Sequence, residues 1–314
     1  MNLVDHIKSR PVIEKLGTIR VDVVETTPFV FGDAFYRLEW ARNQPKPNSR
    51  NINHLRIVES DTGRTISEFG DGFCFPSALV DGDTVYVSGS SVDQTRIQIF
   101  SSRNMTTWET RPTMELGRYR VCNTSLCKTD DGYAMSFEID SPPEEVGVPY
   151  TARFALSHDL RTWTITPPDC VYSRDRYTAP HMLRYHDGQF YLFYLEEFRD
   201  PPHGNKFGCR YEQYVVRSKD LVRWESSPLN PVLAASIEDR RIADPQLGPG
   251  QIDEINRALD CNNSDIDVCE YRGQVVIFYS WGDQTGAEFL AQAVYHGTLT
   301  QFLTSWFPGQ AIKG

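Results

Sequence analysis

Carboxylic acids at the ends of β-rich segments are the residues of this 314-residue chain best suited to chemistry. Asp265 and Asp267 precede the apolar run 275–279, and alternation along a strand would point both side chains to one side. Two acids beside a buried strand are costly unless they are used or paired. We therefore expect at least one of them in a site, the alternative being that they cap the strand or hold a cation. Glu138, at the end of GYAMSFEID, is the second candidate, because its position gives it the same outlook as Asp265; the alternative is a glutamate at the rim that pairs with Arg120 or Arg153.

Further acids and one histidine occupy corresponding positions. Glu196 and Glu197 end a later segment, and only one of two neighbours can face the same side. Glu39 ends an earlier segment, and pairing with Arg42 is the alternative to a role in the site. His181 begins the segment HMLRYHDG and ionises near neutral pH, which suits a general acid. A histidine that hydrogen-bonds a neighbour or binds a central ion is the other interpretation.

Motifs for other chemistries are missing. The chain has no HExxH pattern or His/Cys cluster, so no catalytic zinc site is predicted. It has no GxGxxG, GxxxxGKS/T or GxSxG either, which argues against nucleotide cofactors and serine-esterase chemistry. We expect no required cofactor, and leave open a structural Ca²⁺, Na⁺ or Mg²⁺ in a central channel.

The elements that must position these residues are nearly all strands. Five pairs of β-rich runs flank short Gly-containing turns, which predicts five hairpins, at 29–38, 78–87, 125–137, 182–194 and 268–279. Only 4–16 and 251–259 look helical. Three segments share a Ser-x-(Asp/Asn)-(Leu/Met)-x-x-Trp pattern, and they are Ser102–Trp108, Ser157–Trp163 and Ser218–Trp224.

Repeats of roughly 40–60 residues, one antiparallel sheet each, are typical of propeller blades. We predict an all-β fold: a five-bladed β-propeller with four-stranded antiparallel blades around a central funnel, with a β-sandwich as the alternative. One domain would cover 1–314, with a short N-terminal helical extension at about 1–16. A long insertion at about 228–261 would lie over the funnel, and we expect residues 237–249 to wall one side of the pocket.

In a propeller, the start of each inner strand and the end of the next strand share one face. Collecting the residues at those positions gives a candidate substrate-binding set. Aromatic side chains in it can stack on sugar rings, and its arginines can bind a carboxylate or sulfate. The set is Glu39, Trp40, Arg42, Phe75, Ser77, Arg120, Asn123, Tyr177, Glu196, Trp281 and Gln284.

The repeats also carry a resemblance. SHDLRTW and SKDLVRW resemble outer blade strands of five-bladed propeller glycoside hydrolases of families 32, 43, 68, 117 and 130. The closing segment NNSDIDVCEYRGQVVIFYSWGDQTG is most similar to the closing blade of family 117, whose members act on anhydrogalactose-containing algal oligosaccharides. Two features depart from these families. The first inner strand, TTPFVFGDAFY, lacks the Asp of family 43, and the long N-terminal helical dimerisation segment of family 117 is shortened or missing.

The resemblance implies a glycosidase that acts on an oligosaccharide, and we expect exo-action with inversion by a carboxylate pair. The catalytic candidates are then Asp265, Asp267, Glu138, His181 and Glu197. The alternatives are a glycoside phosphorylase, which needs a phosphate pocket of Arg, Lys and His, and a non-catalytic carbohydrate-binding propeller.

Composition limits the partners. The net charge of −10 argues against nucleic acid, whose binding needs clustered Lys and Arg. No apolar run approaches the roughly 20 residues that span a bilayer, and no secretory signal is present at the start. Seven cysteines without a CxxC pair indicate free thiols. We therefore expect a cytoplasmic protein with no nucleic-acid or membrane partner, and leave its oligomeric state open.

Overall fold

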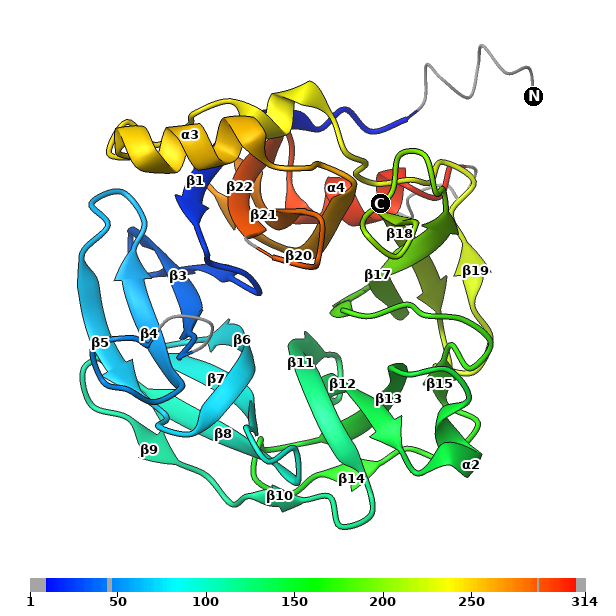
Figure 1. Ribbon diagram of the computed structural model, residues 1–314. Helices are drawn as coiled ribbons and strands as arrows, with labels where there is room; N and C mark the ends of the chain where they lie inside the picture. Colours follow the sequence, from blue (N-terminus) through cyan, green and yellow to red (C-terminus); the bar gives the residue numbers. More distant parts are fainter. Residues whose placement is uncertain (1–9, 44–46, 287, 309–314) are drawn as a thin grey trace.

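The computed structural model describes residues 10–43, 47–286 and 288–308, and antiparallel sheets dominate it (Figure 1). One sheet contains β2 (Thr27–Phe31), β3 (Ala34–Ala41), β4 (His54–Glu59) and β5 (Thr65–Phe69). The next contains β6 (Phe73–Asp81), β7 (Thr84–Ser91), β8 (Arg96–Ser102), β9 (Glu109–Thr110) and β10 (Met114–Glu115). A third contains β11 (Arg120–Thr129), β12 (Gly132–Ser141), β13 (Thr151–Ser157), β14 (Thr164–Ile165) and β15 (Val171–Tyr172). The all-β prediction is confirmed.

The remaining strands form an eight-stranded sheet of two antiparallel halves. One half is β16 (Met182–His186), β17 (Gln189–Arg199), β18 (Cys209–Ser218) and β19 (Glu225–Ser226). The other is β20 (Asn262–Tyr271), β21 (Gln274–Gly282), β22 (Glu288–Tyr295) and β1 (Glu14–Val21). A single parallel pair, Tyr211 with Asn262, joins the halves. Figure 1 shows the strand groups following one another around a common centre.

The predicted hairpins are all present, as β2–β3, β6–β7, β11–β12, β16–β17 and β20–β21. Their turns need left-handed backbone, which glycine adopts without a Cβ penalty. Gly188 has φ 70° and Gly273 has φ 77°. These hairpins fix the inner two strands of each group, and so position the strand ends where the candidate acids lie.

The Ser-to-Trp repeats form the same turn three times. The hydroxyls of Ser102, Ser157 and Ser218 accept hydrogen bonds from the backbone N–H three residues ahead, at 2.8, 2.9 and 2.9 Å. The Trp that ends each turn packs between strands. The Trp108 ring, for example, stacks on Phe69 at 3.8 Å. Each repeat therefore forms the turn that ends a third strand, namely β8, β13 or β18.

The N-terminal helix prediction is wrong for residues 10–16: residues 10–13 form no helix and residues 14–16 begin β1. This strand pairs antiparallel with β22 along its length, from Glu14–Val294 to Val21–Phe289. Backbone pairing with a ready sheet edge outweighs a weak helical pattern. Residues 4–9 of that prediction lie outside the described part of the chain.

Helices are few. The predicted helix at 251–259 is confirmed as α3 (Pro249–Arg257), and the insertion also contains the 3₁₀ turn η1 (Ile237–Arg240). Two short helices were not predicted, α2 (Pro143–Val146) and α4 (Leu299–Ser305). None of the helices in the described ranges is long and apolar enough to cross a membrane.

Candidate active site

Three inner strands begin with the same backbone irregularity. Glu25, Phe75 and Asp265 have φ of 51°, 52° and 52°, and each lies two residues before regular pairing with the neighbouring strand begins or resumes. Left-handed φ is unfavourable for residues with a Cβ and concentrates at functional sites. For Asp265 the irregularity is a bulge between Ser264 and Asp267. The bulge, rather than simple strand alternation, thus brings Asp265 and Asp267 to the same place.

These strand starts surround a central pocket with an enclosed volume of about 40 Å³. Residues at or before the starts of β2, β6, β16 and β20, and residues within β11, contribute to its lining. The predicted residues Asp265, Asp267, His181 and Asn123 all line it, and Glu25 joins them. The full lining is Glu25, Thr26, Thr27, Pro76, Asn123, Thr124, Ser125, Pro180, His181, Met182, Asp265, Ile266 and Asp267.

Two buried carboxyls in this pocket have too few partners to offset the effect of burial on their charged forms. Burial, followed by the charges of Asp265 and Glu138, raises the pKa of Glu25 well above its ordinary value. Burial also raises the pKa of Asp265 to about 6, with the Ser280 hydroxyl and the Arg42 charge acting against the rise. Oε2 of Glu25 is buried and has no hydrogen-bond partner within the protein. Both acids therefore hold a proton more strongly than exposed carboxyls do.

Glu138 lies next to this pair and is tightly held. Its side chain is 1% exposed, and its Oε1 accepts from the backbone N–H of His181 and lies 2.9 Å from Nδ1 of the same residue. Its Oε2 accepts from Nδ2 of Asn123 at 2.8 Å. The other ring nitrogen of His181 is 3.0 Å from Oγ1 of Thr178. Both nitrogens of His181 are thus engaged, and the residue orients Glu138, as the hydrogen-bonding interpretation expected.

Asp267 differs from Asp265 because it is paired. It forms an ion pair with Arg184, accepts from Oγ1 of Thr27 at 2.8 Å and from the N–H of Val268 at 2.7 Å. Burial still raises its pKa, and Arg184 opposes that rise. An aspartate with this many partners links β2, β16 and β20 across the channel, and we no longer count it as a catalytic candidate.

Three predicted substrate-binding residues are parts of the core, so those predictions are wrong. Glu39 is fully buried between Arg37 and Arg56, which lower its pKa against the effect of burial. Ser77 is 1% exposed and accepts from the N–H of Leu126 at 3.1 Å.

Trp281 is also fully buried. Its indole N–H donates to Thr18 at 2.8 Å, and its ring stacks on Phe289 at 4.5 Å. Position along a strand did not reveal that β1 and β22 cover Trp281.

The two arginines of the predicted set, Arg42 and Arg120, already have acidic partners, and so does Arg199. Arg42 pairs with Asp22, Arg120 lies 3.4 Å from Asp140, and the Arg199 guanidinium is 3.6 Å from Glu197. A paired guanidinium has less capacity for an additional anion. The arrangement therefore gives no support to the expectation of an anionic sugar.

Glu196 and Glu197 have separate partners, as their opposite directions require. Glu196 binds Arg176 at 3.0 Å, whereas Oε2 of Glu197 accepts from the Tyr211 hydroxyl at 3.2 Å. Neither lines the central pocket, so the predicted catalytic role of Glu197 is not supported by its position. Glu197 instead lies on the wall that leads to the pocket.

Aromatic side chains form much of that wall. The Tyr177 ring lies 6.1 Å from Tyr211 and 6.5 Å from Tyr150. On the other side, the Trp40 ring is 4.7 Å from Phe75. Gln284, the last member of the predicted set, donates from Nε2 to Asn262 at 3.3 Å.

Sequence reasoning missed Glu25, Tyr150 and Tyr211. Glu25 had a detectable signal, because it precedes its hairpin turn by the same interval as Asp265 precedes its own. Glu288, at the start of β22, was also missed, and burial together with the charge of Asp265 raises its pKa to about 8. Tyr150 lies in a loop and had no such signal.

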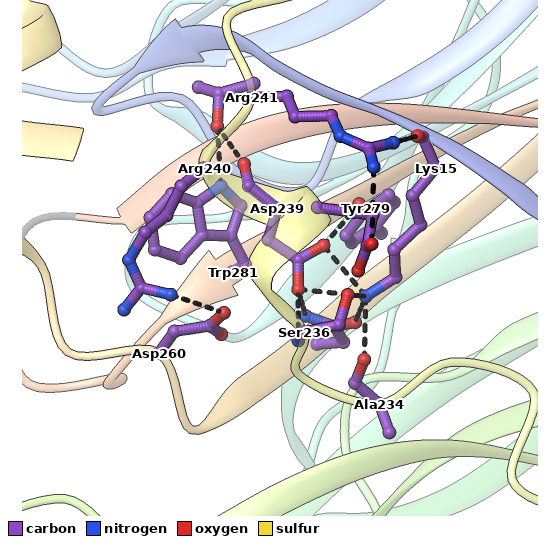
Figure 2. Close-up of polar contacts among 12 residues, drawn as sticks. Lys15, Ala234, Ser236, Asp239, Arg240, Arg241, Asp260, Tyr279 and Trp281 are labelled. Carbon is purple, nitrogen blue, oxygen red and sulfur yellow. Dashed lines mark hydrogen bonds and ion pairs between the residues drawn. The ribbon is translucent and has the colours of Figure 1, made fainter. Parts of the chain in front are cut away.

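The insertion does not wall the pocket as expected, since no residue of 237–249 lines it. It pairs instead along β1, where the N–H of Thr18 donates to the carbonyl of Arg241 at 2.7 Å. Asp239 anchors it in the cluster that Figure 2 shows. We call Lys15, Asp239, Asp260, Asn263 and Tyr279 the insertion cluster.

Within the insertion cluster Asp239 is fully hydrogen-bonded. Nζ of Lys15 donates to Asp239 at 2.8 Å, to Asn263 at 2.7 Å and to the carbonyl of Ala234 at 2.7 Å. The Tyr279 hydroxyl donates to Asp239 at 2.6 Å. Asp239 is fully buried, and these contacts fix the insertion to β1, β20 and β21.

The described residues contain no group of three or more His, Cys, Asp and Glu arranged to hold a metal ion. A structural cation in the channel stays a prediction.

Comparisons with known proteins found a likeness in structure but none in sequence. No protein-family model matches the sequence, and no curated protein matches it. A solved structure described as a glycoside hydrolase is 13% identical with a TM-score of 0.62, and the match covers 95% of this chain and 97% of that one. A structure of the GH130 family, described as containing mannoside phosphorylases and glycoside hydrolases that target β-1,2-mannosidic linkages in Candida mannan, is also 13% identical. Its TM-score is 0.56, over 91% and 94% of the two chains.

The Bombyx mori GH32 β-fructofuranosidase is 10% identical with a TM-score of 0.59, and this chain spans 64% of its length. At such identities the likeness shows the fold. The chain has the all-β architecture of propeller-type glycoside hydrolase structures, and the resemblance drawn from its repeats is confirmed at that level.

Proposed function

We propose that this protein is a glycoside hydrolase built as a five-bladed β-propeller. Counting each half of the eight-stranded sheet as one blade gives five groups, which their single parallel pair supports. β1 would then complete the last blade next to β22. The observation that carries the function is a pocket at the centre of these groups that two buried acids, Glu25 and Asp265, both line, with burial raising the pKa of each.

This pair fits the two roles of glycoside cleavage, in which one carboxyl donates a proton and another acts as base or nucleophile. Glu25 is the proton donor to the leaving oxygen, and Asp265 is the base that activates water. Glu138, held by His181 and Asn123, is the acceptor that orients a sugar hydroxyl. We expect inversion, with the carboxyls of Glu25 and Asp265 roughly 6.5–9.5 Å apart in the complex.

We expect action at a chain end. The enclosed space at the pocket is only about 40 Å³, which holds a few water molecules and leaves no room for the middle of a polymer. None of the described residues that line the pocket is an arginine or a lysine, which favours water over phosphate as the attacking group, because a phosphorylase needs available cations.

The test is turnover of a panel of 4-nitrophenyl glycosides, with and without inorganic phosphate. We expect release of nitrophenol that phosphate does not accelerate, and NMR of the first product should show the inverted anomer. Strict dependence on phosphate would make the protein a phosphorylase. Binding of oligosaccharides without turnover, unaffected by Glu25→Gln and Asp265→Asn, would make it a non-catalytic carbohydrate-binding propeller.

A further inference from the structure

The β17–β18 hairpin extends well beyond the inner strand it accompanies. β16 begins at Met182, which pairs with Phe193, whereas β17 continues to Arg199. Six further residues at about 3.3 Å each carry it roughly 20 Å past that point. β18 pairs with β17 over this whole extension, ending with Arg199 opposite Cys209. The hairpin (green in Figure 1) is therefore a wall at the end of the sheet where the central pocket lies.

The base of this wall touches the proposed site. Tyr177 is followed by Thr178, whose Oγ1 lies 3.0 Å from Nε2 of His181, a residue that lines the pocket. Tyr177 packs in turn with Tyr211 of β18, with ring centroids 6.1 Å apart. An aromatic surface thus starts at the pocket and continues onto the hairpin.

Further contacts connect Tyr211 with the tip of the β17–β18 hairpin. Tyr211 donates to Glu197 at 3.2 Å, and Glu197 lies 3.6 Å from the Arg199 guanidinium. Nη1 of Arg199 donates to the carbonyl of Phe207 at 3.3 Å. Pocket and hairpin tip are thereby connected by a continuous line of aromatic and hydrogen-bonding side chains, which we call the hairpin track: Tyr177, Tyr211, Glu197, Arg199 and Phe207.

The loop at the tip holds Phe207 in a fixed but exposed position. Asn205 is 5% exposed, and its Oδ1 accepts from the N–H of Phe207 at 2.9 Å and of Cys209 at 3.2 Å. Its Nδ2 donates to the carbonyl of Asp283 at 3.0 Å, which ties the loop to the β21–β22 connection. The Phe207 ring is nevertheless 65% exposed. A single exposed apolar residue is ordinary on a surface, but this one is preorganised by a buried side chain.

We propose that the hairpin track is a second sugar-binding subsite, in which Phe207 stacks on a ring of the oligosaccharide distant from the bond being cleaved. Sugar rings present C–H faces that pack on aromatic planes, and Arg199, 73% exposed at its side chain, supplies donors to hydroxyls. Because the loop is already ordered, little conformational entropy is lost on binding. This inference rests on the proposed function, and it states where the part of the oligosaccharide distant from the cleaved bond would bind.

The test compares substrates of increasing length in the full chain. The sugar whose 4-nitrophenyl glycoside is hydrolysed defines the series, from the aryl monosaccharide to its tetrasaccharide. Phe207→Ala should leave kcat/KM unchanged for the aryl monosaccharide and lower it about 3- to 10-fold for the longer members, through KM. Phe207→Trp should restore it. Leu156→Ala, 42% exposed on β13, is the matched control and should change neither.

Equal loss on all lengths, or no loss on any length, would overturn the subsite. Absence of turnover by the wild-type chain on every glycoside would instead refute the proposed function. In that case the subsite itself is tested by binding of the plain oligosaccharides. Weaker binding by Phe207→Ala, with Leu156→Ala unaffected, would support it, and unchanged binding would refute it.

Discussion

The central pocket and the insertion cluster both bury carboxyls, but they treat them in opposite ways. Asp239 of the insertion cluster accepts from Lys15, Tyr279, Asn263 and the backbone of Ser236. In the pocket, Glu25 has an oxygen without any partner. A buried acid that is fully paired holds elements together, whereas one left short of partners is available to a ligand. Asp260 is the exception in the insertion cluster, since its Oδ1 is also buried without a partner, so location in the central pocket together with incomplete pairing selects the candidates for chemistry.

The largest expected effect is on catalysis. Asp265→Asn and Glu25→Gln each remove a proton-transfer group, so kcat on the responsive aryl glycoside should fall at least 10²-fold. Neither change should lower the melting temperature, because each removes a carboxyl whose burial is unfavourable to its charged form. Asp187→Asn, in the exposed turn between β16 and β17, is the control and should retain activity. Full activity in both pocket variants would refute their roles.

For the insertion cluster we expect the opposite result, a loss of stability with activity retained. Asp239→Asn leaves Lys15 buried without its charge partner, which should cost about 3–5 kcal/mol of unfolding free energy. Activity per folded molecule should stay near that of the wild type, since Asp239 does not line the pocket. Chemical denaturation measures the first and titrated activity the second. Glu238→Gln, the partly exposed neighbour, should be nearly neutral; a loss as large as that of Asp239→Asn would contradict this account.

A smaller effect depends on pH. Burial and the charge of Asp239 raise the pKa of Asp260 to about 7. The folded protein therefore holds a proton that the unfolded chain has released, and stability falls as the pH rises from about 4 to 7. Asp260→Asn should thus be more stable relative to the wild type at pH 8 than at pH 5. Thermal unfolding at both pH values measures this, and a difference of the opposite sign would contradict the assigned pKa.

The smallest expected effect concerns how kcat/KM depends on pH through the acids of the pocket. Because Asp265 must be ionised to act as a base, kcat/KM should fall below about pH 6, tenfold per unit. Glu288 stays protonated to about pH 8, so Glu288→Gln should leave this acidic limb close to its wild-type position. A limb that vanished in Glu288→Gln would assign the ionisation to Glu288 instead.

The hairpins and the repeated Trp turns could be predicted because they depend on local sequence: glycine at left-handed turns and a serine that caps each turn. For the candidate site, positions at strand ends correctly predicted that Asp265, His181 and Asn123 lie at one pocket. Glu138 is hydrogen-bonded to two of them, and the catalytic roles stay predictions. The roles of Trp281, Glu39 and Ser77 could not be found in this way, because β22, Arg56 and β11 cover or pair them from distant parts of the chain.

Glu25 was missed in the sequence for a different reason. Its strand was correctly placed, but its irregular backbone moves the functional position two residues upstream of the regular pairing. The same irregularity in Phe75 and Asp265 would have revealed it, had the strands been aligned on their turns. The insertion was misplaced because its apolar and charged residues gave no sign that Lys15 would be their partner.

The most direct test of the central claim is rescue of Asp265→Ala by azide. Removing the carboxylate that activates water leaves space for a small anion, which needs no base to attack the sugar. The account predicts that azide restores release of nitrophenol from the responsive aryl glycoside and produces a glycosyl azide, whereas Glu238→Gln with azide yields only the hydrolysed sugar. An inactive Asp265→Ala variant that stays folded, binds the glycoside and forms no glycosyl azide at any azide concentration would contradict the assignment of Asp265 as the base.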